Sequence, residues 1–139
     1  HGIHAAAMRE SALEIVGFRG FTTYRYTEEA VHYPGDLSNC TTCHTDSGYT
    51  LPLAEGVLGV TVDTGEDRAD PTDDTVSTPT AAVCASCHDD SVAKSHMSSN
   101  GGNFATTQAA IDSGEVVEEC SVCHGSGRNA DVSKVHNPR

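Results

Sequence analysis

The sequence has little of what builds a conventional hydrophobic core. Its 139 residues include no tryptophan, and aromatic residues make up only 5% of the chain. A bare chain of this composition lies near the disordered class, because it has too little apolar side chain to offset the entropy lost on folding. We therefore expect a fold that depends on more than its own side chains.

Basic residues are also scarce. The chain has 8 lysines and arginines against 20 aspartates and glutamates, which gives a formal net charge of −12. Nucleic-acid binding needs basic patches, and docking on anionic lipid needs basic clusters, so neither partner is expected. No apolar run approaches the roughly 20 residues of a transmembrane helix, so the chain is not predicted to span a membrane.

Cysteine is confined to three copies of one pentapeptide. CTTCH, CASCH and CSVCH occupy residues 40–44, 84–88 and 120–124, and no cysteine lies outside them. C-x-x-C-H is the attachment motif of c-type haem: two thiols add to the vinyl groups along one porphyrin edge, and the adjacent histidine binds the iron. We predict three haem c groups. The covalent attachment residues are Cys40, Cys43, Cys84, Cys87, Cys120 and Cys123, and the proximal iron ligands are His44, His88 and His124.

Other uses of paired cysteines explain the pattern less well. A four-thiolate zinc site uses two C-x-x-C pairs, so three such pairs would leave one pair over. Zinc binding also gives no reason for a histidine after every second cysteine. A thioredoxin-like site needs one motif within a βαβ pattern, which is absent. Three disulfides in an exported chain remain possible, but they give no reason for repeated pentapeptides.

The three predicted macrocycles would supply the apolar surface that the side chains lack. The fold class that follows is a multihaem cytochrome c, mostly irregular, with a few short α-helices, little β-structure and a haem-dominated core. We expect one trihaem domain over residues 1–139. In detail, residues 1–17 are predicted to form a helix ending at Gly17, and residues 89–97 and 104–114 short helices. Residues 53–65 are predicted to pair as short strands, and residues 66–80 to form a mobile acidic loop.

Histidine is abundant enough to supply a second axial ligand for each iron. Besides the motif histidines, the chain has His1, His4, His32, His96 and His136. His1, His4, His96 and His136 are the distal candidates, and His32, just before a turn, is a weaker one. Met8 and Met97 could also bind iron, but Met97 adjoins His96 and histidine is preferred at both places. Two imidazoles per iron leave no open position for a substrate, so no catalytic residues are predicted.

The motifs and their surroundings resemble a known family. VHYPGDLSNCTTCH, PTAAVCASCHDDSVAKSHMSSNGG and EECSVCHGSGRNADVSKVH resemble the outer-membrane decahaem cytochromes of metal-reducing bacteria, the OmcA/MtrC family. HGIHAAAMRE resembles the H-x-x-H helix of that family, which supplies distal ligands. The resemblance covers nearly the whole chain, with the acidic stretch 55–75 fitting least well.

The family arrangement sets a specific expectation for the ligands. A pentahaem module of that family carries two haem motifs, then H-x-x-H, then three more motifs, so this chain resembles its C-terminal three-haem part. The resemblance implies four distal ligands for three haems. One of His1 and His4 would then serve a haem on an upstream segment or a neighbouring molecule. A first residue that is not Met and a last residue that is Arg also lead us to expect a fragment of a larger multihaem protein.

The resemblance implies electron transfer through closely spaced haems, with no enzyme activity beyond non-specific metal reduction. The expected partners are other multihaem cytochromes or neighbouring haem domains, and extracellular acceptors such as iron or manganese oxides and flavins. The expected location is exported, at the bacterial cell surface or outer membrane or outside the cell, with the periplasm as an alternative. Two other functions stay open: a subunit of a polymeric cytochrome filament, and a multihaem reductase with one open haem site.

Overall fold

The fold is a long irregular chain that links short elements. A computed structural model describes residues 1–17, 20, 22–46 and 48–136. The elements, in chain order, are β1 (Leu13–Val16), β2 (Thr23–Tyr26), the 3-10 helix η2 (Cys40–Thr42), β3 (Val60–Asp63), β4 (Thr75–Ser77), α1 (Pro79–Cys84), α2 (Ser91–Ser99), α3 (Gln108–Asp112), α4 (Ser121–His124) and α5 (Val132–Val135). This agrees with the expected mostly irregular fold, with short helices and little β-structure.

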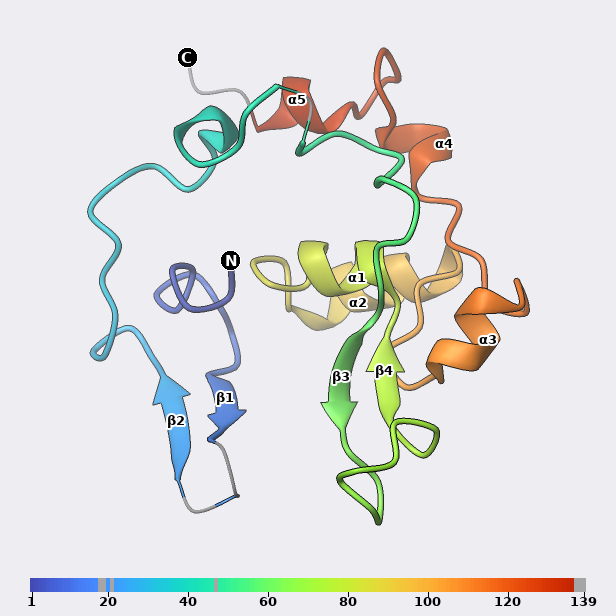
Figure 1. The fold of residues 1–139 in the computed structure, drawn as a ribbon. Helices are drawn as coiled ribbons and strands as arrows, with labels where there is room; N and C mark the ends of the chain where they lie inside the picture. The colour runs from blue at the N-terminus through green and yellow to red at the C-terminus, as the bar shows by residue number, and fades with distance from the viewer. Residues whose placement is uncertain (18–19, 21, 47, 137–139) are drawn as a thin grey trace.

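Two antiparallel hairpins lie at one end of the molecule (Figure 1). In the first hairpin, β1 pairs with β2, with Leu13 opposite Tyr26. In the second, β3 pairs with β4, with a register shift between Thr61 and Asp63. The helices α1 and α2 occupy the middle of the view, and α4 and α5 lie across the end opposite the hairpins. The chain thus forms a ring of segments around a small helical centre.

The predicted N-terminal helix over residues 1–17 is wrong. Residues 2–8 form successive turns, and Leu13–Val16 is strand β1. The amides of Glu10 and Ser11 donate to the carboxylate of Asp89, so they are not available for helical bonds to carbonyls one turn earlier. Gly17 donates to the carbonyl of Thr22 at 2.7 Å and closes the hairpin instead of ending a helix. Long-range contacts therefore override a local preference that is weak for a short segment.

The predictions for the rest of the chain were more accurate. The helices α2 and α3 lie where helices were expected, and each has a side-chain N-cap: Asp90 accepts from Val92 and Ala93, and Thr107 accepts from Ala110. The strand expected in residues 53–65 exists as β3, but it pairs with β4 from outside that stretch. The predicted loop 66–80 is wrong at its C-terminal end, because it contains β4 and the first residues of α1.

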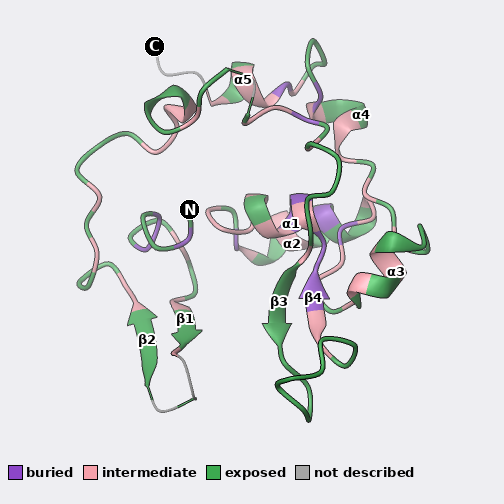
Figure 2. Ribbon diagram, viewed as in Figure 1, coloured by how far each residue is buried: buried purple, intermediate pink, exposed green. Residues whose placement is uncertain are grey.

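Few apolar side chains are buried in the described residues. The buried apolar set is Ala5, Ala6, Leu51, Val76, Ala81 and Met97. Many other apolar side chains are exposed, including Val60 and Val62 of β3, at 53% and 56% of their accessible surface. Figure 2 shows burial concentrated around α1, β4 and the turns near the N-terminus. The polypeptide described here encloses only a small apolar core of its own.

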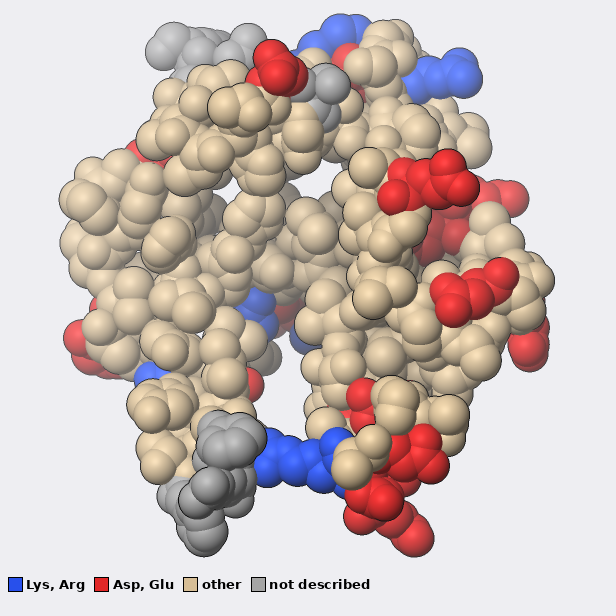
Figure 3. Space-filling view, in the orientation of Figure 1, with Lys and Arg blue, Asp and Glu red and all other residues tan. Residues whose placement is uncertain are grey.

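The surface is acidic and the molecule is open. Figure 3 shows Asp and Glu gathered mainly over the side that carries α3 and the β3–β4 hairpin. The same view shows openings between that side and the side that carries β1 and β2. Within the described ranges, the longest helix has nine residues. None of the described helices is long and apolar enough to cross a bilayer.

Candidate functional site

The three C-x-x-C-H pentapeptides adopt the same local backbone structure. In each, the amide of the motif histidine donates to the carbonyl of the first cysteine at 2.9 Å. The amide of the second cysteine donates to the same carbonyl at 3.2, 3.2 and 3.3 Å in chain order. One helical turn therefore presents two thiols and one imidazole in every copy. The repeated sequence is matched by a repeated conformation, although η2, α1 and α4 place it differently within their elements.

The six cysteines are free thiols, and no two of them form a disulfide. Burial, reinforced by the negative charges at Cys120 and Glu118, raises the pKa of Cys84 to about 11. Burial also raises the pKa of Cys87 and of Cys120. Among the residues described, no group of three or more His, Cys, Asp or Glu side chains could hold a metal ion. The arrangement thus favours neither a disulfide framework nor a zinc cluster.

Each motif histidine lies beside a different histidine from elsewhere in the chain. His1 faces His44, with 3.4 Å between the two Nε2 atoms and 5.7 Å between the ring centres. The rings of His88 and His136 have their centres 6.0 Å apart. The rings of His96 and His124 have theirs 6.1 Å apart. Six of the eight histidines therefore form three separate pairs.

The spacing of these pairs can be compared with what an iron between two imidazoles requires. A metal–imidazole bond is about 2 Å long, and the ring centre lies about 1 Å beyond the nitrogen, so two axial imidazoles have centres about 6 Å apart. The pairs at 6.0 and 6.1 Å match this value. The pair of His1 and His44 is closer, and its Nε2 atoms would separate by about half an ångström to accept two such bonds. The donor set and its spacing fit the iron of a six-coordinate haem.

Backbone hydrogen bonds orient two of these rings. Nδ1 of His124 lies 3.0 Å from the carbonyl oxygen of Ala130, and Nδ1 of His136 lies 3.2 Å from that of Val132. A carbonyl oxygen only accepts, so Nδ1 carries the proton in each ring. In the neutral tautomer that this hydrogen bond selects, Nε2 is the nitrogen available to bind a metal.

The remaining candidates lie apart from the motif histidines. The ring of His4 stacks on Tyr33, with centres 5.1 Å apart and 26° between the planes. His32 is exposed, and no contact between it and a motif histidine occurs in the part of the chain that the structure describes. Met97 is buried among the apolar residues of the small core, whereas Met8 is 63% exposed. The structure therefore brings His1, but not His4, to a motif of this chain.

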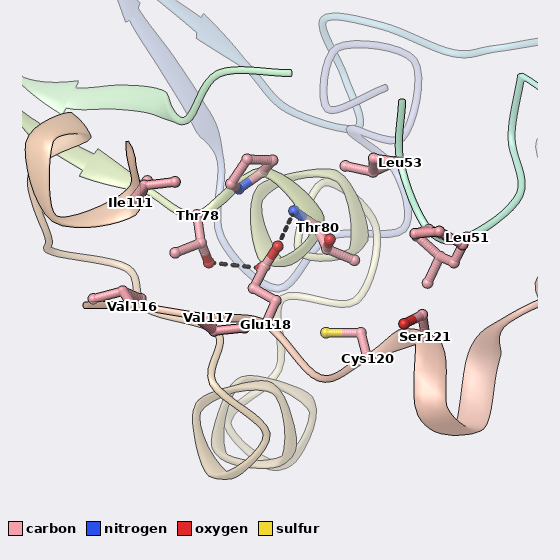
Figure 4. A pocket seen from close by; sticks show the side chains of 12 residues that line it. Leu51, Leu53, Thr78, Thr80, Ile111, Val116, Val117, Glu118, Cys120 and Ser121 are labelled. Carbon is pink, nitrogen blue, oxygen red and sulfur yellow. Dashed lines mark hydrogen bonds between the residues drawn. The ribbon is translucent and has the colours of Figure 1, made fainter. Parts of the chain in front are cut away.

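A carboxylate that was not singled out from the sequence joins the second and third motifs. Glu118 accepts from the hydroxyl of Thr78 at 2.6 Å and from the amide of Thr80 at 2.8 Å (Figure 4). It also accepts from the amide of Ala81 at 2.7 Å. It thereby caps the start of α1, the helix that ends at Cys84, from a position two residues before Cys120. The only sequence signal is that Glu118 lies two residues before a motif, and other acidic residues of this chain, such as Asp46 and Glu119, lie as near to one.

Glu118 also lies at a pocket of about 300 Å³. Apolar side chains from three remote segments line this pocket, among them Leu51, Ile111 and Val116, together with Cys120 (Figure 4). The pocket also has polar lining from Thr78, Thr80 and Ser121, so it is a mixed apolar and polar surface next to a motif thiol. It lies between the start of α1 and the start of α4, where α4 follows Cys120 of the third motif.

One of the comparisons with known proteins identifies a family for this chain. The family model "outer membrane cytochrome MtrC/MtrF-like, domains II/IV" matches residues 1–137. No curated protein and no solved structure matches the chain. The family match spans all three motifs and all eight histidines, including the six histidines that form the three pairs. The chain therefore belongs to the family of MtrC/MtrF-like outer membrane cytochrome domains II/IV.

Proposed function

We propose that residues 1–139 form one trihaem c-type cytochrome domain that transfers electrons through closely spaced, covalently bound bis-histidine haems. The observation that carries the proposal is the pairing of every motif histidine with a different second histidine. The thiols of each motif would attach one haem, and the pairs His1–His44, His88–His136 and His96–His124 would hold the three irons. Three sites in 139 residues are necessarily close together.

The residues of the chain fit electron transfer better than catalysis. When bound, haem c supplies a one-electron iron couple. Two imidazoles at each iron leave no coordination position for a substrate and preserve the geometry of the site in both oxidation states. The hydrogen bonds from Nδ1 of His124 and His136 fix the ring orientation that this ligation needs. We therefore propose an electron-transfer protein that is at most a non-specific metal reductase.

The open, sparsely packed structure supports a haem-dominated core. The exposed side chains of β3 offer apolar surface, and the openings between the two sides of the molecule offer space for the porphyrins. Covering that surface with porphyrin would bury the area that the polypeptide leaves exposed. We expect the chain without haem not to fold, as in small metal domains in which binding energy is folding energy.

His4 is proposed as a ligand for a haem outside this chain. It is exposed and stacked on Tyr33, while His1 already faces His44. The acceptor haem would lie on an upstream segment of a larger multihaem protein or on a neighbouring molecule. A holoprotein structure with both His1 and His4 bound to haems of the same chain would refute this. Ordered polymers seen by electron microscopy would favour the filament alternative, and a strictly monomeric holoprotein would argue against it.

Family membership supports a location outside the cytoplasm. Domains of this family belong to outer membrane cytochromes, so we propose export to the bacterial cell surface, with other multihaem cytochromes or neighbouring haem domains as donors. Iron or manganese oxides and flavins are the proposed extracellular acceptors.

The test is a haem count followed by a spectrum of the reduced holoprotein with and without carbon monoxide. We expect three haems per chain and sharp low-spin bands that carbon monoxide leaves unchanged. A count below three would contradict the trihaem assignment. A shifted Soret band would show an open or labile iron and would favour the reductase alternative.

A further inference from the structure

Two charged side chains that are not among the proposed iron ligands, Arg9 and Asp89, fasten the N-terminal segment to the second motif. Arg9 donates from Nη1 to the carbonyl oxygens of Ala85 at 2.8 Å and Ser86 at 2.9 Å. These two residues are the spacers between Cys84 and Cys87 of the pentapeptide. One guanidinium therefore holds both variable positions of the second motif, from more than seventy residues away in the sequence.

The carboxylate that follows this motif completes the contact. Asp89 accepts from the amides of Glu10 and Ser11 at 2.8 and 2.9 Å, and it forms an ion pair with Nη2 of Arg9 at 3.4 Å. The side chains of Asp89 and Arg9 retain only 1% and 11% of their accessible surface. Since Asp89 directly follows His88, a balanced pair of buried charges lies against the second motif.

The same contact fixes the segment that carries the first histidine pair. His1 faces His44, and the turns of residues 2–8 lead directly from His1 to Arg9. Fastening residues 9–11 to residues 85–89 therefore ties the first site to the second. The other ion pair between described side chains, Arg25 with Glu14 at 3.0 Å, is 65% and 51% exposed and lies in the first hairpin.

We propose that Arg9 and Asp89 are positioning residues that balance the charge at the second haem site and so set the reduction potential of its iron. The proposal rests on the proposed function, because it needs a haem between His88 and His136. A buried charge acts through a low dielectric and is weakly screened, unlike one in the exposed pair. Removing the guanidinium leaves an unpaired carboxylate, which stabilises ferric iron and lowers the potential. Removing the carboxylate charge leaves an unpaired guanidinium, which raises it.

The experiment is a spectroelectrochemical titration, at one fixed pH, of holoproteins shown to contain three haems. The variants are R9Q, R9K and D89N, with R25Q and E14Q as matched controls from the exposed pair. The H136M variant identifies the wave of the second haem, because methionine ligation raises the potential. We expect that wave to shift down in R9Q, up in D89N and little in R9K. The controls should leave all three waves unchanged.

Several outcomes would overturn the proposal. They are no shift beyond the controls, shifts of the same sign in R9Q and D89N, and shifts spread equally over the three waves. If D89N does not incorporate three haems, the test rests on the reduction potential of the second haem in R9K and R9Q. Equal potentials in these two variants would refute a role for the charge of Arg9. If R9Q also fails to incorporate three haems, the contact serves assembly alone and the proposal fails. A wild-type chain without three haems would instead refute the proposed function.

Discussion

Replacing Glu118 by alanine tests whether one carboxylate holds the second and third motifs together. The substitution removes hydrogen bonds from the hydroxyl of Thr78 and from the amides of Thr80 and Ala81, at 2.6, 2.8 and 2.7 Å. A hydrogen bond to a charged group contributes about 1.5–3 kcal/mol when buried, and we take about 1 kcal/mol for each here because Glu118 is only half-buried. The expected loss is about 3 kcal/mol, a large part of the 5–15 kcal/mol of a typical domain.

The assay is equilibrium unfolding of the holoprotein in guanidinium chloride, followed by far-ultraviolet circular dichroism. The variants are compared on condition that the dependence of the unfolding free energy on denaturant concentration is the same in each. A shift of the denaturant concentration at the unfolding midpoint then reports a change in the free energy of unfolding. Glu119→Ala is the matched control, because Glu119 is the exposed neighbour of Glu118. We expect this control to stay within about 0.5 kcal/mol of the parent protein. Glu118→Gln keeps an acceptor oxygen without the charge, and it should lose roughly half as much as Glu118→Ala.

Equal stability of Glu118→Ala and Glu119→Ala would refute the reasoning. It would mean that the three hydrogen bonds are replaced by water at no cost, and that α1 keeps its place without a cap from the third motif. An equally large loss in Glu118→Gln and Glu118→Ala would show that the charge, and not the acceptor geometry, carries the effect.

Two further predictions concern a ligand and the response to pH. Replacing His96 by alanine should make one haem in three bind carbon monoxide, whereas the same change at His32 should leave the spectrum unchanged; equal responses would refute the pairing. At Asp131, hydrogen bonds from the hydroxyl of Ser133 and the amide of Gly127 lower the pKa of the carboxyl group. The stability that this carboxylate adds should therefore be present above about pH 4 and be lost as the pH falls below it. Asp131→Asn should weaken that acid dependence in unfolding curves measured from pH 7 down to pH 3, and an unchanged profile would contradict it.

The local sequence was a good guide wherever the structure is local. The three pentapeptides form the same helical turn because the bonds that make the turn lie within the pentapeptide itself. The helices α2 and α3 begin at capping residues that the sequence displays, Asp90 and Thr107. The N-terminal helix was mispredicted because its competing partner, Asp89, lies far away in the sequence.

The sequence by itself determined how many haem sites this protein is expected to have and which residues form each attachment motif, because C-x-x-C-H chemistry is contained in five consecutive residues. Only the tertiary structure decided which second histidine lies at which motif. His96 follows the second motif yet lies beside His124, and His136 follows the third yet lies beside His88. Such a crossed arrangement depends on contacts between remote segments, such as those of Glu118 with the start of α1, and contacts of that kind have no fixed spacing that a sequence could reveal.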